Sequence, residues 1–349
     1  MPRRSIRLLA TLVPLLLGGS VSGLADECQS YTLPDLEVIT LTNVSRLTLF
    51  KTLELAQYNR GSISQCSIGF SADGHLLVGT CGRSPALVFD LQAGTVWDLE
   101  PEPQDQLVAS AAQSGRGVIA VGGFGESISL WNGVSGELVG TLGASLPPIW
   151  ELTFSPDGRK LAACSIHGAV LLWDVASQEV DWTYKGVGGF LSVAFDSCGQ
   201  RLAYGSLRDQ VGVLDALTGE RILHLPEPDG HVGDVAFGPN ELLAAGCDDR
   251  KIYIWRLDQD AGPVLLTGHS GYVNGVTFSH DGSLLVSGSH DKTVSVWNVA
   301  TQERLVTRSG HQSAVLRVAF NPEGRVIASI SWDGTVRLWG VPVRGSDDP

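Results

Sequence analysis

From about residue 38 onward, short apolar stretches with alternating hydrophobic and polar positions are separated by polar turns. Residues 273–297, for example, read VNGVTF, the turn SHDG, SLLVSGS, the turn HDK, and TVSVW. Alternation with a period of two and β-branched residues predict strands joined by tight antiparallel turns. A fourth strand follows a further turn, as in ATQE before RLVTR at residues 300–308. No stretch after residue 26 has the period of an amphipathic helix, so the sequence predicts an all-β chain.

This four-strand pattern repeats with steps of 41 or 42 residues, as two phased markers show. The first marker precedes a turn such as SPDG, at Phe70, Ala112, Phe154, Phe195, Phe237, Phe278 and Phe320. The second follows about nineteen residues later, at Phe89, Trp131, Trp173, Leu214, Trp255, Trp297 and Trp339. Seven units with this period are typical of propeller blades.

The Gly-His, Asp and strand-ending Trp of the two C-terminal units resemble the WD40 repeat. The resemblance covers roughly residues 38–342 and implies a seven-bladed β-propeller with four antiparallel strands per blade. The last unit has no fourth strand after it, whereas RLTLFKTLEL, residues 46–55, alternates as a strand ahead of the first unit. A missing outer strand would leave an exposed edge. We therefore expect this N-terminal strand to complete the seventh blade.

His269, Ser289 and Asp291 are the residue types of a hydrolytic triad, and they lie within one unit. The same types recur 42 residues later, and a catalytic triad has no reason to be duplicated in register. In the WD40 family these residues form a buried hydrogen-bonded chain. The resemblance therefore implies a structural role for His269, Ser289, Asp291, Trp297, His311, Ser331, Asp333 and Trp339. The other five units have incomplete sets, and we expect the blades on the N-terminal side to depend on apolar packing and to open first.

The N-terminus has a basic start, an apolar run from about Leu8 to Leu17 and a small-residue exit, which is the layout of a secretory signal peptide. The alternative, an uncleaved anchor, is disfavoured because a spanning helix needs roughly 20 apolar residues. We expect cleavage near Ala25 and export of the mature chain, to the periplasm or the medium, without a membrane span. The predicted organisation is a signal peptide (1–25), an N-terminal lead-in (26–37), the propeller (38–342) and a C-terminal tail (343–349).

Charge and cysteines restrict the function further. Removing residues 1–25 takes away three arginines and no acids, which changes the formal net charge from −13 to −16. An acidic chain without a basic cluster is a poor nucleic-acid binder.

Cys66 and Cys81 fall nearly opposite each other around the SADG turn, so they form either a cross-strand disulfide or two buried thiols. No P-loop, HExxH, GxGxxG or GxSxG motif occurs, and we expect no catalytic residue, metal site or cofactor.

In the resembling family, the loops before the first strands and the turns between second and third strands share one rim, where partners commonly dock. Here that rim has a large apolar and aromatic share for positions at which polar residues are usual. The sequence thus favours a monomeric, non-enzymatic scaffold that presents this face to a protein or peptide. The candidate contact residues are Trp332, Trp150, His290, Tyr272, Phe190, Phe124, Ile166 and Leu207.

The alternative function is an enzyme or small-ligand binder that uses the central channel. It requires charged groups that converge at the channel. For this the sequence offers Arg83, His167, Arg208 and His290, on different blades and without paired carboxylates.

Overall fold

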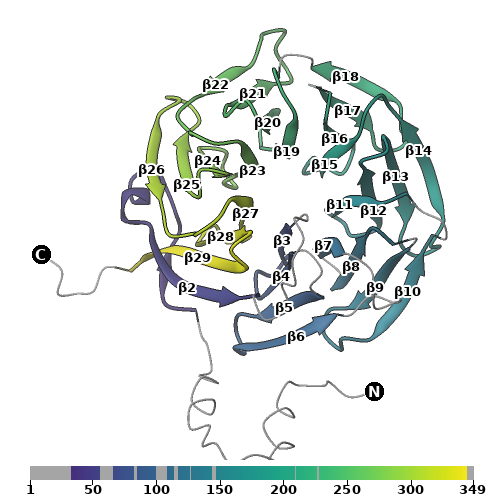
Figure 1. Ribbon diagram of the computed structural model, residues 1–349, viewed down its shortest axis with the longest axis horizontal. Coiled ribbons are helices and arrows are strands. Elements are labelled where there is room, and N and C mark those ends of the chain that lie inside the picture. Colours follow the sequence, from purple (N-terminus) through teal and green to yellow (C-terminus); the bar gives the residue numbers. More distant parts are fainter. Residues whose placement is uncertain are drawn as a thin grey trace, which may run out of the picture.

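Seven antiparallel sheets surround a central axis as a closed ring (Figure 1). The computed structural model describes residues 33–55, 66–81, 85–99, 108–113 (backbone only), 117–125, 127–143, 147–208, 210–225 and 228–343. The predicted signal peptide, most of the lead-in, nearly all of the tail, and Arg83 lie outside these residues. Within them, no helix is both long and apolar enough to cross a membrane.

Each of the first six blades consists of four consecutive strands, and we number the blades in chain order. Blade 1 comprises β3 (Cys66–Phe70), β4 (Leu76–Cys81), β5 (Ala86–Asp90) and β6 (Thr95–Leu99). Blade 2 comprises β7 (Val108–Gln113), β8 (Val118–Gly123), β9 (Ile128–Asn132) and β10 (Leu138–Leu142). Blade 3 comprises β11 (Ile149–Phe154), β12 (Lys160–Ser165), β13 (Ala169–Asp174) and β14 (Val180–Lys185).

The C-terminal blades repeat this order. Blade 4 comprises β15 (Phe190–Phe195), β16 (Arg201–Ser206), β17 (Val211–Asp215) and β18 (Arg221–Leu225). Blade 5 comprises β19 (Val232–Phe237), β20 (Leu242–Cys247), β21 (Ile252–Arg256) and β22 (Val264–Leu266). Blade 6 comprises β23 (Val273–Phe278), β24 (Leu284–Ser289), β25 (Val294–Asn298) and β26 (Arg304–Arg308).

Blade 7 closes the ring with a strand from the other end of the chain, as the sequence predicts. It comprises β27 (Val315–Phe320), β28 (Val326–Ser331), β29 (Thr335–Pro342) and β2 (Thr48–Glu54). β2 pairs with β29 from Thr48↔Gly340 to Glu54↔Thr335. The short β1 (Leu36–Glu37) also pairs with the end of β29, and the 3₁₀ turn η2 (Val44–Arg46) precedes β2. The N-terminal segment therefore belongs to the last blade, where it covers an edge that would otherwise be unpaired.

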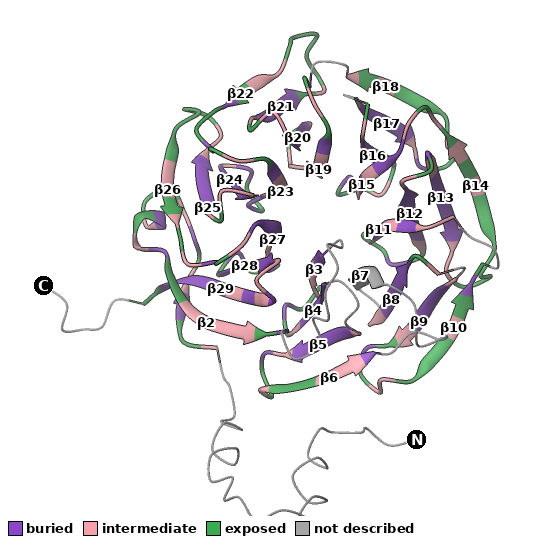
Figure 2. Ribbon diagram, viewed as in Figure 1, coloured by how far each residue is buried: buried purple, intermediate pink, exposed green. Residues whose placement is uncertain are grey.

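Burial follows the position of each strand in its blade. The second and third strands are packed between neighbouring blades and are largely buried, whereas the outer strands β10, β14 and β18 are exposed along much of their length (Figure 2). The apolar residues of facing blades interdigitate to form the core, and first strands of adjacent blades contact each other around the whole ring. The second marker of the repeat contributes to this core, because Trp173, Trp255, Trp297 and Trp339 are fully buried.

Six of the seven first strands contain a β-bulge near their beginning. In β11 the register with β12 shifts between Ile149 and Glu151, and the same shift occurs in β7, β15, β19, β23 and β27. A bulge adds one residue to a strand and re-aims the side chains beside it. Blade 1 is the exception, since Cys66 pairs directly with Cys81 and Ser67 with Thr80.

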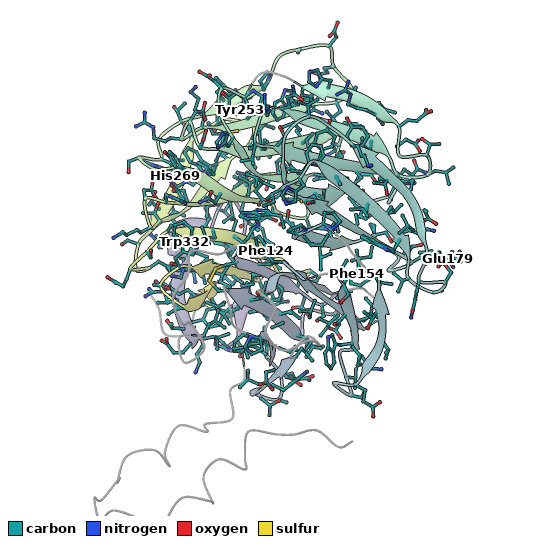
Figure 3. The ribbon with its side chains drawn as sticks, turned by 45° about the vertical axis from the view of Figure 1, so that its right-hand side comes forward. Phe124, Phe154, Glu179, Tyr253, His269 and Trp332 are labelled. Atoms are coloured by element: carbon teal, nitrogen blue, oxygen red, sulfur yellow. A yellow bond between two sulfur atoms is a disulfide. The ribbon has the colours of Figure 1, made fainter. Side chains whose placement is uncertain are left out.

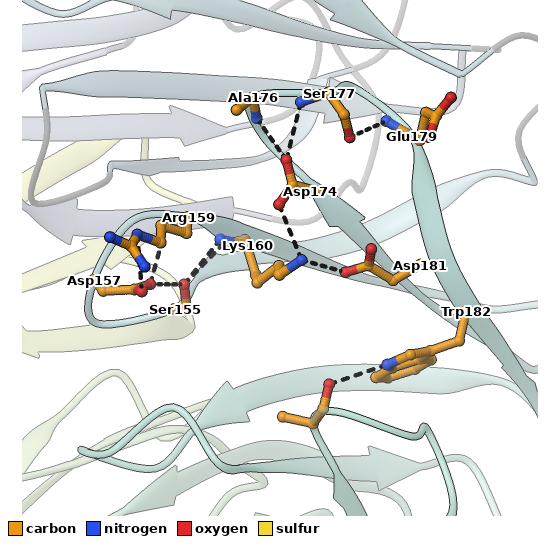
Figure 4. Close-up of polar contacts among 11 residues, drawn as sticks. Ser155, Asp157, Arg159, Lys160, Asp174, Ala176, Ser177, Glu179, Asp181 and Trp182 are labelled. Atoms are coloured by element: carbon orange, nitrogen blue, oxygen red, sulfur yellow. Dashed lines mark hydrogen bonds and ion pairs between the residues drawn. The ribbon is translucent and has the colours of Figure 1, made fainter.

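The outside of the ring has contacts that join neighbouring blades, and blade 3 provides an example (Figure 4). Trp182 on β14 donates its indole N–H to the backbone carbonyl of Ala216 in blade 4, 3.0 Å away. Its ring packs on Gly219, where a Cβ would lie 2.7 Å from the indole. Within blade 3, Lys160 bridges Asp174 and Asp181 at 3.0 and 2.7 Å. Through its contacts with Ala216 and Gly219, Trp182 covers the outer flank of blade 3 and joins it to blade 4.

Candidate functional site

A buried hydrogen-bonded chain holds the second turn of blade 6. His269 lies with Nδ1 2.7 Å from the Asp291 carboxylate and Nε2 2.7 Å from the Ser287 hydroxyl. Trp297 donates its Nε1–H to the same Ser287 oxygen at 2.8 Å. The arrangement that pairs every group has Nδ1–H donating to Asp291 and the serine hydroxyl donating to Nε2. The chain therefore ties β24, β25, the loop before β23 and the second turn together in one blade.

The serine of this chain is Ser287, so the sequence-based prediction of Ser289 was wrong by two positions. Ser289 instead donates to the carbonyl of Gly271 at 3.1 Å and accepts the backbone N–H of Asp291 at 3.1 Å. The two serines lie on the same face of β24, since strand side chains alternate. Ser287 is the one within reach of the indole.

Blade 7 repeats the chain with the same correction. His311 is 2.9 Å from Asp333 and 2.8 Å from Ser329, and Trp339 donates to Ser329 at 2.9 Å. Ser331, predicted for this role, donates to the carbonyl of Ser313. We call the two complete sets, His269–Asp291–Ser287–Trp297 and His311–Asp333–Ser329–Trp339, the blade locks.

Hydrogen bonds determine the charge state of the two lock aspartates. Burial by itself would raise the pKa of Asp291, but hydrogen bonds from His269 and the Thr293 hydroxyl outweigh it and lower this pKa well below the usual range. The pKa of Asp333 is lowered in the same way by His311 and Thr335. Both carboxylates are therefore ionised at neutral pH, which suits hydrogen-bond acceptors inside a blade.

In blades 2, 3 and 5 the position of the lock serine is Val121, Ala163 or Ala245. The corresponding indole nitrogens of Trp131, Trp173 and Trp255 are buried and have no hydrogen-bond partner among the described residues. An unpaired buried N–H costs about 1–3 kcal/mol. These three blades thus keep the tryptophan for its apolar volume and lack the polar chain.

Blades 4 and 5 fill the same space in other ways. In blade 4, Tyr204 stands at the serine position and stacks on Tyr184 and Phe190, with ring centroids 5.6 and 4.7 Å apart. Gly212 opposite makes room for this ring, because a Cβ there would lie 2.2 Å from it. In blade 5, the Tyr253 hydroxyl donates to Asp249 at 2.8 Å, which is the bond that histidine makes in the blade locks.

The second turns of blades 6 and 7 each present one ring to the rim where first strands begin, which we call the top face. His290 lies between Ser289 and Asp291, and its ring centroid is 5.0 Å from that of Trp332 in the next blade. On its other side, His290 is 5.2 Å from Tyr272. Tyr272 is 51% exposed, while His290 and Trp332 are half-buried. These three residues form a continuous aromatic row across two blades, which we call the aromatic arc.

Burial makes His290 a neutral ring. Desolvation lowers the pKa of this histidine below its usual value, so the imidazole is uncharged at pH 7. The arc is accordingly an apolar, ring-lined surface with polar edges, which is the composition of an interface centre.

The remaining predicted rim residues divide into three kinds. Phe124, 37% exposed, and the half-buried Trp150 form a second aromatic pair with centroids 6.1 Å apart. Ile166 and Leu207 are half-buried turn residues. Phe190 is 2% exposed and packs in the core, so its predicted place on the binding surface was wrong. Figure 3 shows Trp332 and Phe124 on the two blades that flank blade 1.

The central channel contains a charged cluster that sequence reasoning missed. Arg317 on β27 lies with Nε 3.0 Å from Glu151 on β11 and 3.9 Å from Asp234 on β19. All three side chains are buried. The structure thus places two carboxylates around one guanidinium, whereas the sequence suggested no paired carboxylates. The predicted channel residues His167 and Arg208 lie instead on exposed turns.

The sequence does contain a signal for this cluster, namely the shared position of its three residues within their units. Glu151, Asp234 and Arg317 each stand three residues before the first marker of their unit, so they occupy equivalent positions in three first strands. First strands line the axis of a propeller, and the recurrent bulge directs this position inward. Within the described residues, no group of three or more His, Cys, Asp or Glu side chains is arranged to hold a metal ion.

The cysteines differ in state. Cys66 and Cys81 form a disulfide between directly paired positions of β3 and β4, with Cα atoms 4.1 Å apart. Cys164, Cys198 and Cys247 are not part of a disulfide; Cys164 and Cys247 are buried and Cys198 is exposed. Burial, together with the charge of Glu151, raises the pKa of the Cys164 thiol well above its usual value. Cys164 is therefore an unreactive core residue.

The fold and its repeated blades agree with a comparison of the sequence with known protein families. The model of the family "WD domain, G-beta repeat" matches residues 136–174, 219–256, 263–298 and 302–340. Together with the seven four-stranded blades, these matches show that the chain belongs to the WD40-repeat β-propellers. The matched segments leave out the first three strands of blade 4, where Leu214 stands at the tryptophan position.

Curated relatives share part of the chain. It is 32% identical to the WD repeat-containing protein SL1-17 of Schistosoma mansoni over 37% of this chain and 43% of that protein. It is 30% identical to the meiotic recombination protein rec14 of Schizosaccharomyces pombe over 39% of this chain and 46% of that protein. A guanine nucleotide-binding protein subunit beta of Oryza sativa subsp. japonica is 25% identical over 54% and 52%. The chain therefore spans about half or less of the length of these relatives.

Proposed function

We propose that this chain is an exported, monomeric, non-enzymatic scaffold that binds a protein or peptide partner on its top face. The aromatic arc is the observation that carries the proposal. Tyr272, His290 and Trp332 place three neighbouring rings on two adjacent blades, with the Tyr272 ring tilted against His290 and half exposed. Tyrosine and tryptophan dominate the binding energy of protein interfaces because they bury large rigid surfaces.

The blade locks support this role because they hold the turns that carry the arc. The Asp291 backbone N–H is bonded to Ser289, and its carboxylate to His269, so His290 is fixed from both sides. In blade 7, Ser331 and Asp333 fix Trp332 in the same way. A surface held rigid before binding loses less conformational entropy when a partner docks.

The charged cluster argues against the channel as a substrate site. Glu151 already pairs with Arg317, and Arg317 also donates to the carbonyl of Asn274 at 2.7 Å. A catalytic carboxylate must be within reach of a substrate, whereas these residues are only 6–9% exposed. Opening the channel would separate a buried ion pair, at a cost of about 3–5 kcal/mol.

Export is supported by the Cys66–Cys81 disulfide, because such bonds persist in oxidising compartments. It agrees with the basic start and short apolar run of the N-terminus. The proposed location is therefore the periplasm or the medium, where the partner is also expected.

Partner capture with matched variants tests the proposal. The mature chain serves as bait for the exported proteins of its source, and bound proteins are quantified by mass spectrometry. Tyr272→Ala and His290→Ala are expected to lower the yield of the specific partner at least tenfold, with the melting temperature nearly unchanged. The matched control is Leu217→Ala, since Leu217 is 87% exposed on the β17–β18 turn at the opposite face. Equal capture by the arc variants and wild type would remove the proposed surface.

A further inference from the structure

The charged cluster in the channel combines an excess of negative charge with burial. The seven first strands contain three charged side chains in their sequences, Glu151, Asp234 and Arg317. With all three ionised the cluster would have a net charge of −1, surrounded by the apolar inner ring. A buried charge without a directly paired counter-charge is strongly disfavoured.

The hydrogen bonds of the guanidinium go to groups other than Asp234. Its Nε donates to Glu151 at 3.0 Å. One terminal nitrogen donates to the carbonyls of Asn274 and Leu316 at 2.7 and 3.1 Å, and the other to Leu191 at 3.5 Å. These carbonyls belong to bulge residues of blades 6, 7 and 4. Arg317 therefore ties together several blades across the axis, and Glu151 receives its direct ionic bond.

Asp234, by contrast, is surrounded by neutral donors. Its Oδ1 lies 2.9 Å from the Ser192 hydroxyl oxygen. The same Oδ1 accepts the backbone N–H of the next residue, Val235, at 3.1 Å. Its Oδ2 accepts the N–H of Val276 at 2.9 Å. The 3.9 Å between Asp234 and the Arg317 Nε exceeds hydrogen-bond distance. Of the two carboxylates, Asp234 is thus the one that lacks a directly bonded cation.

We propose that the channel cluster binds one proton at neutral pH, held on Asp234, and that this proton stabilises the closed ring. Each carboxyl oxygen faces one backbone N–H, which only donates. Oδ1 also faces the Ser192 hydroxyl, which donates to an ionised carboxylate and can turn to accept a hydrogen bond from a protonated one. The cluster then contains one ionic pair, Glu151 with Arg317, and one neutral acid.

The electrostatic environment supports this assignment. Burial raises the pKa of Asp234 to about 7, and the charge of Glu151 adds to the rise while that of Arg317 opposes it. The flanking strands β15 and β23 contain no ionisable side chain. The groups that face the cluster from other elements are the Cys164 thiol on β12, whose pKa is raised, and Ser192.

The proton makes stability depend on pH in a defined direction. An unfolded aspartate has a pKa of about 3.9, so between about pH 4 and pH 7 the folded chain holds a proton that the unfolded chain lacks. Stability contributed by Asp234 is complete below this window and is lost as the pH rises through it.

Denaturant unfolding of the mature chain between about pH 5 and pH 7 tests the proposal. The unfolding equilibrium constant of wild type is expected to rise by up to about tenfold per pH unit relative to that of Asp234→Asn. The matched control is Asp196→Asn, which removes a buried aspartate that is bonded directly to Arg201 at 2.9 Å. This control should keep the wild-type dependence. Parallel pH profiles for wild type and Asp234→Asn would overturn the proposal.

Infrared spectroscopy of wild type with labelled aspartate gives a readout that does not require the variant to fold. A protonated carboxylic acid band is expected at pH 6 and should decrease toward pH 8. In Glu151→Gln the guanidinium is free to pair with Asp234, so the band should disappear at lower pH than in wild type. Absence of an acid band from wild type at pH 6 would contradict the assignment.

Discussion

Blades 6 and 7 and blades 2, 3 and 5 have the same strands in the same order, but different interactions hold them. The first pair has complete blade locks in which one serine hydroxyl joins a histidine to a tryptophan. The second group keeps the tryptophan and leaves its buried indole N–H unpaired. The comparison teaches that apolar packing with a period near 42 residues is sufficient for the propeller architecture. The hydrogen-bonded chain adds rigidity at the second turns of blades 6 and 7.

The location of the locks connects this difference to function. Both complete locks lie under the aromatic arc, since His290 and Trp332 stand inside the two turns that the locks fix. The corresponding turns of blades 3 and 4 carry Ile166 and Leu207 without such a lock. The molecule thus has one top-face sector with preorganised aromatic residues, and we expect partner binding to depend on it.

The largest expected effect comes from removing the strand that closes the ring. Deletion of residues 38–55 takes away β2 and leaves β29 with an unpaired edge, even though the lock of blade 7 remains. We expect loss of cooperative unfolding and aggregation, because closure involves every blade. Thermal melting followed by circular dichroism measures this. A deletion variant that melts like wild type would show that the locks alone hold blade 7.

Removing a lock serine should have the next largest effect. Ser329→Ala leaves His311 Nε2 and Trp339 Nε1 buried without a partner and should cost about 2–4 kcal/mol in the free energy of unfolding. The matched control, Ser331→Ala, removes a hydrogen bond to the Ser313 carbonyl and one from the Asp333 N–H, but it leaves the lock intact and should cost less, about 1–2 kcal/mol. Urea titrations compare the two. The reverse order would restore Ser331 as the centre of the lock.

Acid should weaken the locked blades selectively. The pKa of Asp333 is lowered in the folded chain, so its stabilising contribution is present above the unfolded pKa of about 3.9 and is lost as the pH falls through the folded pKa. Asp333→Asn is expected to be less stable than wild type at pH 6 and to lose less stability on acidification below about pH 4. Denaturant midpoints across this range measure the difference. An unchanged acid slope in the variant would exclude Asp333 as a source of acid sensitivity.

The smallest expected effect is an increase in stability. Ala163→Ser places a hydroxyl at the lock-serine position of blade 3, next to the unpaired indole of Trp173. We expect stabilisation by about 1 kcal/mol or less, since one hydrogen bond is gained without a histidine to complete the chain. The same change at Ala245 provides a second trial beside Trp255. Destabilisation at both positions would mean that the indoles tolerate no polar neighbour.

The sequence was sufficient to predict the ring, the number of blades and the closing strand, because period and alternation follow directly from strand geometry. It could not select Ser287 over Ser289. Both serines face the same side of β24, and the choice depends on the ladder, in which Trp297 pairs with Leu285 and lies diagonal to Ser287. Phe190 was misplaced for a related reason, since packing on Tyr204 buries a residue that the register assigns to the rim.

The channel cluster needed information of another kind. Glu151, Asp234 and Arg317 are far apart in the chain, and only ring closure brings them together. Their shared register position was visible in the sequence, but pairing blade 3 with blade 7 requires the diameter of the inner ring. Side-chain contacts across the axis therefore came from the structure.

Native-state hydrogen exchange of the second turns tests the central claim most directly, namely that the locks hold the arc rigid. The account predicts that amides at residues 289–293 and 331–335 exchange more slowly than the equivalent amides at 165–169 in blade 3 and at 206–208 and 210 in blade 4. Ser329→Ala should remove the protection in blade 7 and leave that in blade 6. Equal or faster exchange in the locked turns of the wild-type chain would contradict the account.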